Sequence, residues 1–296
     1  MLMSWTSQKS PQERMDCNDL YITSLNSGSN GNCYYVGNSE EAVLIDAGIS
    51  CREIEKRMLR LNLSMSQVKA LFISHEHSDH IKGVCTLAKK YQLPVYITSG
   101  TLRNCRFDLN PGLVKNLSSH SRTQIGRLTV TAFPKIHDAI EPHSFMVSCG
   151  DTHVGVFTDL GAVCGELTKY FKQCHAAFLE ANYDEQMLQN GGYPYFLKQR
   201  ICGGKGHLSN RQALELFNTH RSPHLSHLLL SHLSKDNNNP ELVKALFDGQ
   251  ANGTEIIVAS RHEETAVFVV SAKSPASKEF ATLNYSNPQL QLALGV

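Results

Sequence analysis

The sequence predicts two β-sheets packed on each other with helices on their outer faces, an α/β (α+β) arrangement. Short apolar runs predict about a dozen strands, and amphipathic or capped segments predict five or more helices. Strands fall in runs in each half of the chain with helices between them, and no linker rich in Pro, Gly or Ser divides it. We therefore expect a single domain over residues 18–271, between a disordered leader (1–17) and a poorly ordered tail (272–296).

The composition limits the class of protein. With 296 residues, 41% hydrophobic, the chain is long enough to bury a large core. A net charge of +1 produces no global field that would favour a polyanion, although a local basic patch remains possible. No stretch approaches the roughly 18 consecutive apolar residues of a membrane span. Nine cysteines without a C-x-x-C pair argue against a disulfide framework, so we expect a cytoplasmic protein.

Apolar runs in the first half predict strands separated by turns and helices. The expected strands cover residues 20–25, 33–37, 42–46, 68–73 and 93–98. Ser50 and Glu53 form a capping box, which predicts a helix from there to about Leu61. A shared apolar face predicts a second helix over residues 80–91.

The second half is richer in strands. Expected strands cover residues 128–133, 144–149, 154–158, 176–180, 225–230, 255–259 and 266–270. Expected helices cover residues 166–173, 209–220 and 240–248, the middle one opening on a capping box of Ser209 and Gln212. Residues 193–206 open on aromatic side chains and close on glycines, which predicts a loop.

A cluster of histidines and carboxylates directly follows the apolar run 68–73. It contains His75, His77, Asp79 and His80. Imidazole and carboxylate are preferred ligands of borderline divalent cations, and so many together at a strand end are costly unless a metal binds them. His75 and His77 lie two residues apart and can point to one side of an extended chain. Asp79 and His80 can then serve a second ion.

Polar residues recur where other apolar strands stop. These residues are Asp46, His137, Asp159, Glu180 and His232. Strand ends gathered at one edge are a common way for a rigid scaffold to present a site. Two ions need further ligands, and His137, Asp159 and His232 are the candidates.

The order Asp46, His75-x-His77-x-Asp79-His80, His137, Asp159, His232 resembles the metallo-β-lactamase superfamily over residues 18–270. The resemblance implies an αββα sandwich with two divalent ions at one edge, zinc first and manganese or iron as alternatives. It implies that His75, His77 and His137 hold one ion, that Asp79, His80 and His232 hold the other, and that Asp159 bridges them. Asp46 is implied to orient ligand imidazoles through hydrogen bonds.

Within the superfamily, flavoprotein oxygen reductases have Glu at the position of His77, so this chain resembles the hydrolases. The Asp79–His80 pair is similar to that of dinuclear phosphodiesterases such as tRNase Z. The stretches around Glu180 and His207 resemble those that supply an acid–base pair there. Segments 24–33, 158–161, 180–184, 197–201 and 232–237 resemble the YycJ/WalJ group, which implies 5′-to-3′ exonuclease action on DNA.

The resemblance implies a metal-bridging hydroxide as nucleophile, with Asp79 in the catalytic centre. We expect His207 to protonate the leaving oxygen and Glu180 to fix its tautomer. The alternative is that Glu180 is a surface carboxylate and His207 an ordinary loop histidine.

Two segments could contact a nucleic-acid substrate. Residues 186–214 contain Lys198, Arg200 and Lys205, aromatic neighbours and no acidic residue, so they could follow a phosphate backbone or be a solvated loop. The turn with Ser27, Ser29 and Asn30 could bind phosphate through backbone N–H groups, or only shape the sheet edge. DNA is favoured over RNA as partner, and no membrane is expected.

Two other functions fit the same ligand residues. A thioester or lactone hydrolase of this fold would not need the Glu180–His207 pair. A non-catalytic metal-binding regulatory protein would show no turnover with metal bound.

Overall fold

The computed structural model describes residues 18–272, and these form two seven-stranded sheets. The predicted leader (1–17) and residues 273–296 of the predicted tail lie outside the described residues. The strands of the first sheet, in spatial order, are β14 (Phe268–Val270), β1 (Leu20–Asn26), β2 (Cys33–Gly37), β3 (Ala42–Ile45), β4 (Val68–Phe72), β5 (Val95–Ile97) and β6 (Val114–Asn116). Those of the second are β13 (Glu255–Val258), β12 (His227–Ser231), β11 (Ala176–Glu180), β10 (Thr152–Phe157), β9 (His143–Cys149), β8 (Leu128–Pro134) and β7 (Arg122–Ile125).

Both sheets are mixed in the same way. From β14 to β3 neighbouring strands run antiparallel, and from β3 to β6 they run parallel. In the second sheet β7 to β10 are antiparallel and β10 to β13 are parallel. Parallel neighbours require crossover connections, which place helices on the sheet faces. Parallel strands also end together, so the residues that follow them meet at one edge.

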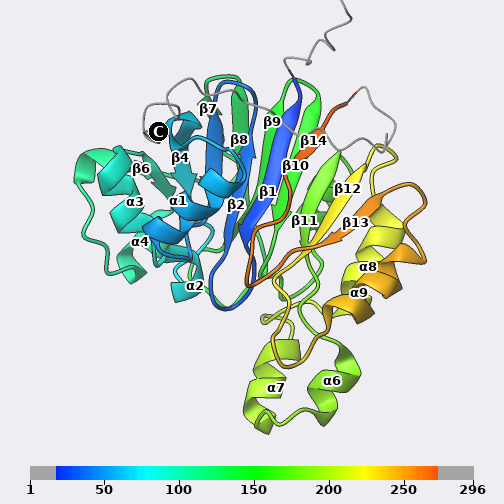
Figure 1. Ribbon diagram of the computed structural model, residues 1–296. Coiled ribbons are helices and arrows are strands. Elements are labelled where there is room, and N and C mark those ends of the chain that lie inside the picture. Colours follow the sequence, from blue (N-terminus) through cyan, green and yellow to red (C-terminus); the bar gives the residue numbers. More distant parts are fainter. Residues whose placement is uncertain (1–17, 273–296) are drawn as a thin grey trace, which may run out of the picture.

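Helices cover the outer face of each sheet, as Figure 1 shows. The helices of the first half are α1 (Cys51–Arg60), α2 (Ser78–Ile81), α3 (Val84–Tyr91) and α4 (Ser99–Asn104). Those of the second half are α5 (Gly165–Phe171), α6 (Glu185–Asn190), α7 (Tyr195–Cys202), α8 (Asn210–His220) and α9 (Pro240–Asp248). Helices α6 and α7 project beyond the sheets (Figure 1).

Three apolar cores hold these layers together. Strand β1 contributes to two of these cores, because both of its faces are buried. Leu20 and Ile22 pack between the two sheets, whereas Tyr21 and Leu25 pack toward the helices. A third cluster joins the second sheet to α5, α8 and α9. The predicted αββα sandwich is therefore the observed fold.

The helix predicted over residues 80–91 is instead two helices, α2 and α3, separated at Gly83. The N–H of Gly83 donates to the carbonyl of Ala47 at 2.7 Å, and a Cβ atom on Gly83 would lie 2.1 Å from the carbonyl oxygen of Ile49. This close approach of two backbones requires glycine and interrupts the helix.

The loop predicted over residues 193–206 was wrong for most of its length, because Tyr195–Cys202 forms α7. Pro194 directly precedes the helix, and none of its residues is a helix breaker. None of the eight side chains is fully buried, so the sequence lacks the apolar stripe by which a helix is usually recognised. Helices α4 and α6 and strands β6 and β7 were not predicted either.

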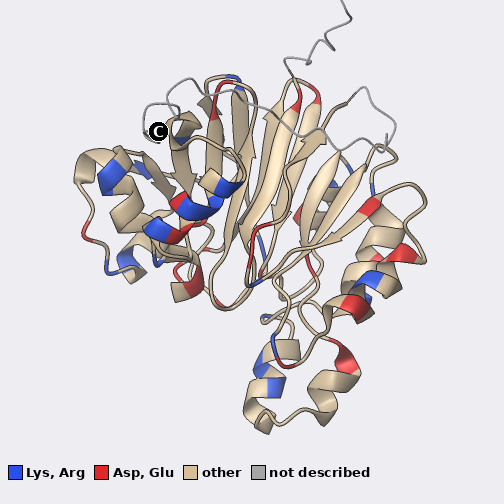
Figure 2. Ribbon diagram, viewed as in Figure 1, with Lys and Arg blue, Asp and Glu red and all other residues tan. Residues whose placement is uncertain are grey.

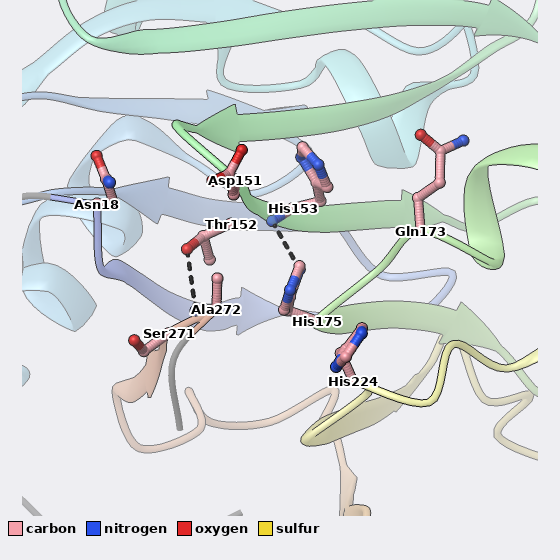
Figure 3. A pocket seen from close by; sticks show the side chains of 9 residues that line it. All are labelled: Asn18, Asp151, Thr152, His153, Gln173, His175, His224, Ser271 and Ala272. Atoms are coloured by element: carbon pink, nitrogen blue, oxygen red, sulfur yellow. Dashed lines mark hydrogen bonds between the residues drawn. The ribbon is translucent and has the colours of Figure 1, made fainter. Parts of the chain in front are cut away.

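A cavity of about 470 Å³ lies at the edge of the second sheet where the parallel strands β10, β11 and β12 begin (Figure 3). Its wall includes His153, His175 and His224, with Asp151 in the turn before β10. The backbone N–H of His153 donates to Nδ1 of His175 at 3.2 Å, so the proton of the His175 ring is on Nε2. Burial, reinforced by His153 and His224, lowers the pKa of His175 to about 4.

This shift predicts a loss of stability in acid. Between about pH 6.5, the ordinary histidine pKa, and pH 4, the unfolded chain binds a proton at His175 that the folded chain does not. The free energy of unfolding should therefore fall as pH is lowered through this window. His175→Gln should remove this contribution, so that urea unfolding at pH 5 and pH 7.5 differs less for the variant than for the parent.

His262→Gln, at an exposed site, is the matched control and should keep the parent's pH dependence. An equal acid sensitivity of the parent and His175→Gln would contradict the prediction.

Candidate functional site

The predicted ligand residues gather at one edge of the sandwich, and both sheets contribute. Asp46 and the segment 74–80 follow β3 and β4 of the first sheet. In the second sheet, His137, Asp159 and His232 follow β8, β10 and β12, and Glu180 is the last residue of β11.

The first group consists of His75, His77 and His137, whose ring nitrogens lie within 4.8 Å of one another. His75 Nε2 is 3.1 Å and His137 Nε2 is 3.4 Å from His77 Nδ1. The far nitrogens are engaged elsewhere: His137 Nδ1 donates to the carbonyl of Gly206 at 3.0 Å, and His75 Nδ1 lies 2.8 Å from the hydroxyl of Ser74. Burial lowers the pKa of His137 to about 4, so its facing nitrogen offers a lone pair.

The second group consists of Asp79, His80, Asp159 and His232. His80 Nε2 lies 3.2 Å from Asp159 Oδ2 and 3.6 Å from Asp79 Oδ2, and His232 Nε2 lies 3.5 Å from Asp79 Oδ2. Asp159 Oδ1 is also 3.9 Å from His137 Nε2, so Asp159 lies between the two groups. Although burial opposes ionisation, His232 and His80 hold the pKa of Asp159 well below its usual range.

Asp46 lies behind both groups. Its Oδ2 is 2.7 Å from His80 Nδ1 and accepts from the Ser74 hydroxyl at 2.7 Å, while its Oδ1 accepts from the Ser74 N–H at 2.8 Å. The Ser74 hydroxyl in turn contacts His75. Asp46 is thus placed to set the orientation of one imidazole directly and of another through Ser74.

Three residues of the site adopt left-handed backbone conformations directly after strands. These are Asp46 (φ 61°), Asp159 (φ 57°) and His232 (φ 57°). Asp and His tolerate this region better than most residues, but it still stores strain. The left-handed residue turns the chain sharply, and the side chain stays at the strand end, over the site.

Glu180 and His207 form a hydrogen-bonded pair beside the second group. Glu180 Oε1 is 2.7 Å from His207 Nδ1 and 3.1 Å from His232 Nδ1, and Glu180 Oε2 accepts from the N–H of Leu160 at 2.6 Å. Glu180 is fully buried, unlike the surface carboxylate of the alternative. Burial opposes its ionisation, but His207 and His232 lower the pKa of Glu180 to about 2.

Two N–H groups of the turn expected to bind phosphate donate to acceptors within the protein. The N–H of Ser27 donates to the Ser260 carbonyl, and that of Gly28 donates to Asn32 Oδ1. Ser27 is buried, and its hydroxyl oxygen accepts from the N–H of His232 at 2.8 Å. Ser27 therefore supports His232 instead of facing a ligand.

A directed hydrogen-bond chain, not foreseen from the sequence, continues from Ser27. The Tyr34 hydroxyl donates to Asn32 Oδ1 at 3.1 Å, so the Ser27 hydroxyl donates to Tyr34 at 2.8 Å. Since Gly28 also donates to Asn32 Oδ1, the Asn32 amide nitrogen must point the other way, where it lies 3.2 Å from Asp79 Oδ2. The chain links His232 of one sheet to Asp79 of the other.

Lys135 is a second unforeseen residue, and the only sequence signal for it was its position two residues before His137. It is buried, and its ammonium donates to the carbonyl of Thr158 at 2.7 Å, next to Asp159. Burial lowers the pKa of Lys135, whereas Asp159, Asp46 and Glu180 oppose that shift. Lys135 therefore supplies positive charge close to the buried carboxylates Asp159, Asp46 and Glu180.

The two groups open into a cavity of about 310 Å³. Its lining includes His207 and Asp138, and from α7 Leu197, Arg200 and Ile201. Arg200 Nε donates to Asp138 Oδ2 at 2.7 Å.

The six residues expected to contact substrate lie in different surroundings, and only some of them line the cavity. Ser29 and Arg200 line the cavity. The side chain of Asn30 donates to the carbonyl of Arg261, and that of Lys198 donates to the carbonyl of Gln189. Lys205 is exposed on the segment that leads to His207, and Ser27 is buried as described.

The hydrogen-bond chain predicts a stability cost for Tyr34→Phe. Removal of the hydroxyl leaves the buried Ser27 hydroxyl without its acceptor and Asn32 without one donor, which should lower the free energy of unfolding by about 1–3 kcal/mol. Urea unfolding measures the change. Tyr195→Phe removes an exposed hydroxyl and should have little effect; equal effects of the two substitutions would show that the chain does not stabilise the fold.

Comparison with known proteins identifies the family. Residues 41–233 match the family described as a beta-lactamase superfamily domain. Exodeoxyribonuclease YycJ of Bacillus anthracis is 34% identical over 233 residues, which cover 76% of this chain and 86% of that protein. Exodeoxyribonuclease WalJ of Streptococcus pneumoniae is 33% identical over 223 residues, covering 74% and 83%.

Solved structures share the fold. The metallo-beta-lactamase fold protein YhfI from Bacillus subtilis matches with a TM-score of 0.63 at 16% identity, covering 85% of this chain and 98% of that one. The short form of human tRNase Z matches with a TM-score of 0.56 at 17% identity and the same coverages. The predicted resemblance is confirmed: the chain belongs to the metallo-β-lactamase superfamily.

Proposed function

We propose that the chain is a dinuclear phosphodiesterase that degrades nucleic acid, acting on DNA as a 5′-to-3′ exonuclease. Membership of the superfamily makes it a metal-dependent hydrolase. The phosphodiesterase proposal rests on the Glu180–His207 pair, whose histidine lines the same cavity as the ligand groups. The two exodeoxyribonuclease relatives support DNA over RNA as substrate.

The side chains at the edge fit two divalent ions. Asp159 Oδ2 and His232 Nε2 are buried and have no hydrogen-bond partner among the described residues, a costly state that a cation would relieve. Imidazole and carboxylate suit zinc first, and also manganese or iron. In this proposal His75, His77 and His137 would hold one ion, Asp79, His80 and His232 would hold the other, Asp159 would contribute to both, and Asp46 would orient His80.

When bound, two such ions lower the pKa of a shared water and stabilise the attacking and leaving oxygens of the phosphodiester. Asp79 is the more accessible carboxylate of its group, with 19% of the side chain exposed against 2% for Asp159. It lines the cavity and can accept a proton from the attacking water.

In this proposal His207 protonates the leaving oxygen. Its Nδ1 is held by Glu180, so the other ring nitrogen, Nε2, can hold the proton that is transferred. Glu180 stays ionised because of its low pKa, so it can accept the hydrogen bond from the Nδ1–H group of His207 without taking the proton itself.

Arg200 is the proposed phosphate contact. Its Nε is fixed by Asp138, which leaves the two terminal nitrogens of the guanidinium available to a phosphate at the cavity wall. Ser29 lines the cavity beside it, and Asn30 holds the turn that carries Ser29. Lys198 and Lys205 would extend the positive charge away from the cavity.

We also propose that the protein is located in the cytoplasm. The described cysteines are all free thiols, which supports a reducing cytosol. No helix among residues 18–272 has the length and apolarity to cross a bilayer.

Removal of the proton donor is expected to stop phosphodiester cleavage while metal stays bound. For His207→Ala we expect a loss of about 10²- to 10⁴-fold on labelled DNA, because general acid catalysis contributes roughly that factor. The assay compares a phosphodiester reporter, labelled DNA and a thioester side by side, with metal content measured on the same samples.

His224→Ala, at an exposed position beside the other cavity, where the parallel strands begin, should leave cleavage unchanged. DNA that stays intact with zinc, manganese and iron alike would overturn the nuclease proposal. Thioester turnover that survives His207→Ala would favour a thioester or lactone hydrolase, and no turnover of any substrate with metal bound would favour a regulatory protein.

Asp159→Asn should lower the metal-to-protein ratio. Asn adopts the left-handed conformation of this position but lacks the charge that both groups share. We expect at least one of the two ions to be lost in elemental analysis after dialysis. Asp151→Asn, an exposed turn residue, should retain both. Full occupancy in Asp159→Asn would contradict a bridging role.

A further inference from the structure

Helix α7 connects the cavity to an exposed surface outside it. Leu197, Arg200 and Ile201 line the cavity, and their spacing places them on one face of the helix. Helices α6 and α7 project beyond the sheets (Figure 1), so the rest of α7 faces solvent.

Two aromatic rings lie at the outer end of this helix, one turn before Arg200. Tyr195 is 76% exposed and Phe196 is 73% exposed, more than any other large apolar side chain among the described residues. Adjacent rings left in water are costly, and a pair of them suggests a binding surface. The structure gives them no role in packing, because none of the residues of α7 is buried.

The chain on either side of the rings is basic, and two of its basic side chains have acidic partners from outside it: Arg200 lies beside Asp138 and Arg211 beside Glu185. Residues 186–214 carry Lys198, Arg200, Lys205 and Arg211 and no acidic residue. Figure 2 shows α7 with basic bands and no acidic ones. Arg200 also faces the cavity, where its Nε is paired with Asp138 and its two terminal nitrogens lie between the rings and the ligand groups.

Resting on the phosphodiesterase function proposed above, we propose that α7 is a platform for single-stranded DNA. Bases stack on Tyr195 and Phe196, the next phosphate contacts Arg200, and the following phosphodiester enters the cavity. Aromatic rings bind unpaired bases because their faces are free, whereas a duplex keeps its bases stacked on each other. A cavity of about 310 Å³ is at the small end of ligand pockets and admits a strand more readily than a duplex.

Direct binding tests the platform. A labelled single strand of about 16 nucleotides is titrated with full-length His207→Ala protein and zinc, with binding followed by fluorescence anisotropy. In this background Tyr195→Ala/Phe196→Ala should raise Kd by about 5- to 150-fold for each ring that stacks on a base. Exchange of the two rings, Tyr195→Phe/Phe196→Tyr, should restore most of the affinity.

The matched control is Leu242→Ala/Leu246→Ala, which removes two partly exposed apolar side chains from α9 and should not change Kd. An unchanged Kd for the double alanine variant on α7 would overturn the platform, as would a duplex that binds as tightly as the single strand. Sedimentation that shows a dimer dissolved by the same variant would also overturn it, because the rings would then join two copies of the chain.

The two proposals fail differently. If the wild-type enzyme binds the strand through α7 but leaves it intact with zinc, manganese and iron, the nuclease function fails and the platform stands. If the double alanine variant cleaves the single strand with the parent's KM, the platform fails and the nuclease function stands.

Discussion

Buried negative charge is the constraint on which the rest of this structure depends. Asp46, Asp159 and Glu180 are almost wholly buried at one edge of the sandwich, where an isolated carboxylate would not ionise. Each contacts an imidazole that follows another strand, and Lys135 adds positive charge nearby. Because the charges stabilise one another across strands, the edge is complete only when all of its strands are in place.

The residues of the edge could be predicted because they directly follow recognisable strands. An apolar run that ends in Asp46, Asp159 or His232 is visible in the sequence alone, and parallel strands bring their ends together. The two sheets were predictable for a related reason, since strands buried on both faces are apolar almost throughout. His207 follows no strand and was predicted from the resemblance of its stretch to tRNase Z, and only the structure shows its contact with Glu180.

Features that depend on contacts between distant segments were not predictable. In the sequence Asn32 is one of several polar residues in a turn, and only its contacts with Gly28 and Asp79 show its orientation. Lys135 is an ordinary lysine in sequence, and its burial follows from the packing of both sheets. Helix α7 was missed because it is short and buries no side chain fully, so its residues carry no periodic signal.

The division of the ligand residues between the sheets has a consequence for how activity arises. His75 and His77 follow a strand of one sheet, whereas His137, Asp159 and His232 follow strands of the other, so neither half of the chain contains a complete set. An intermediate with both sheets formed but not yet docked would have its secondary structure and no site. A metal-dependent hydrolase whose candidate ligands are divided in this way would be inert until it is fully assembled, and its activity would report the integrity of the whole fold.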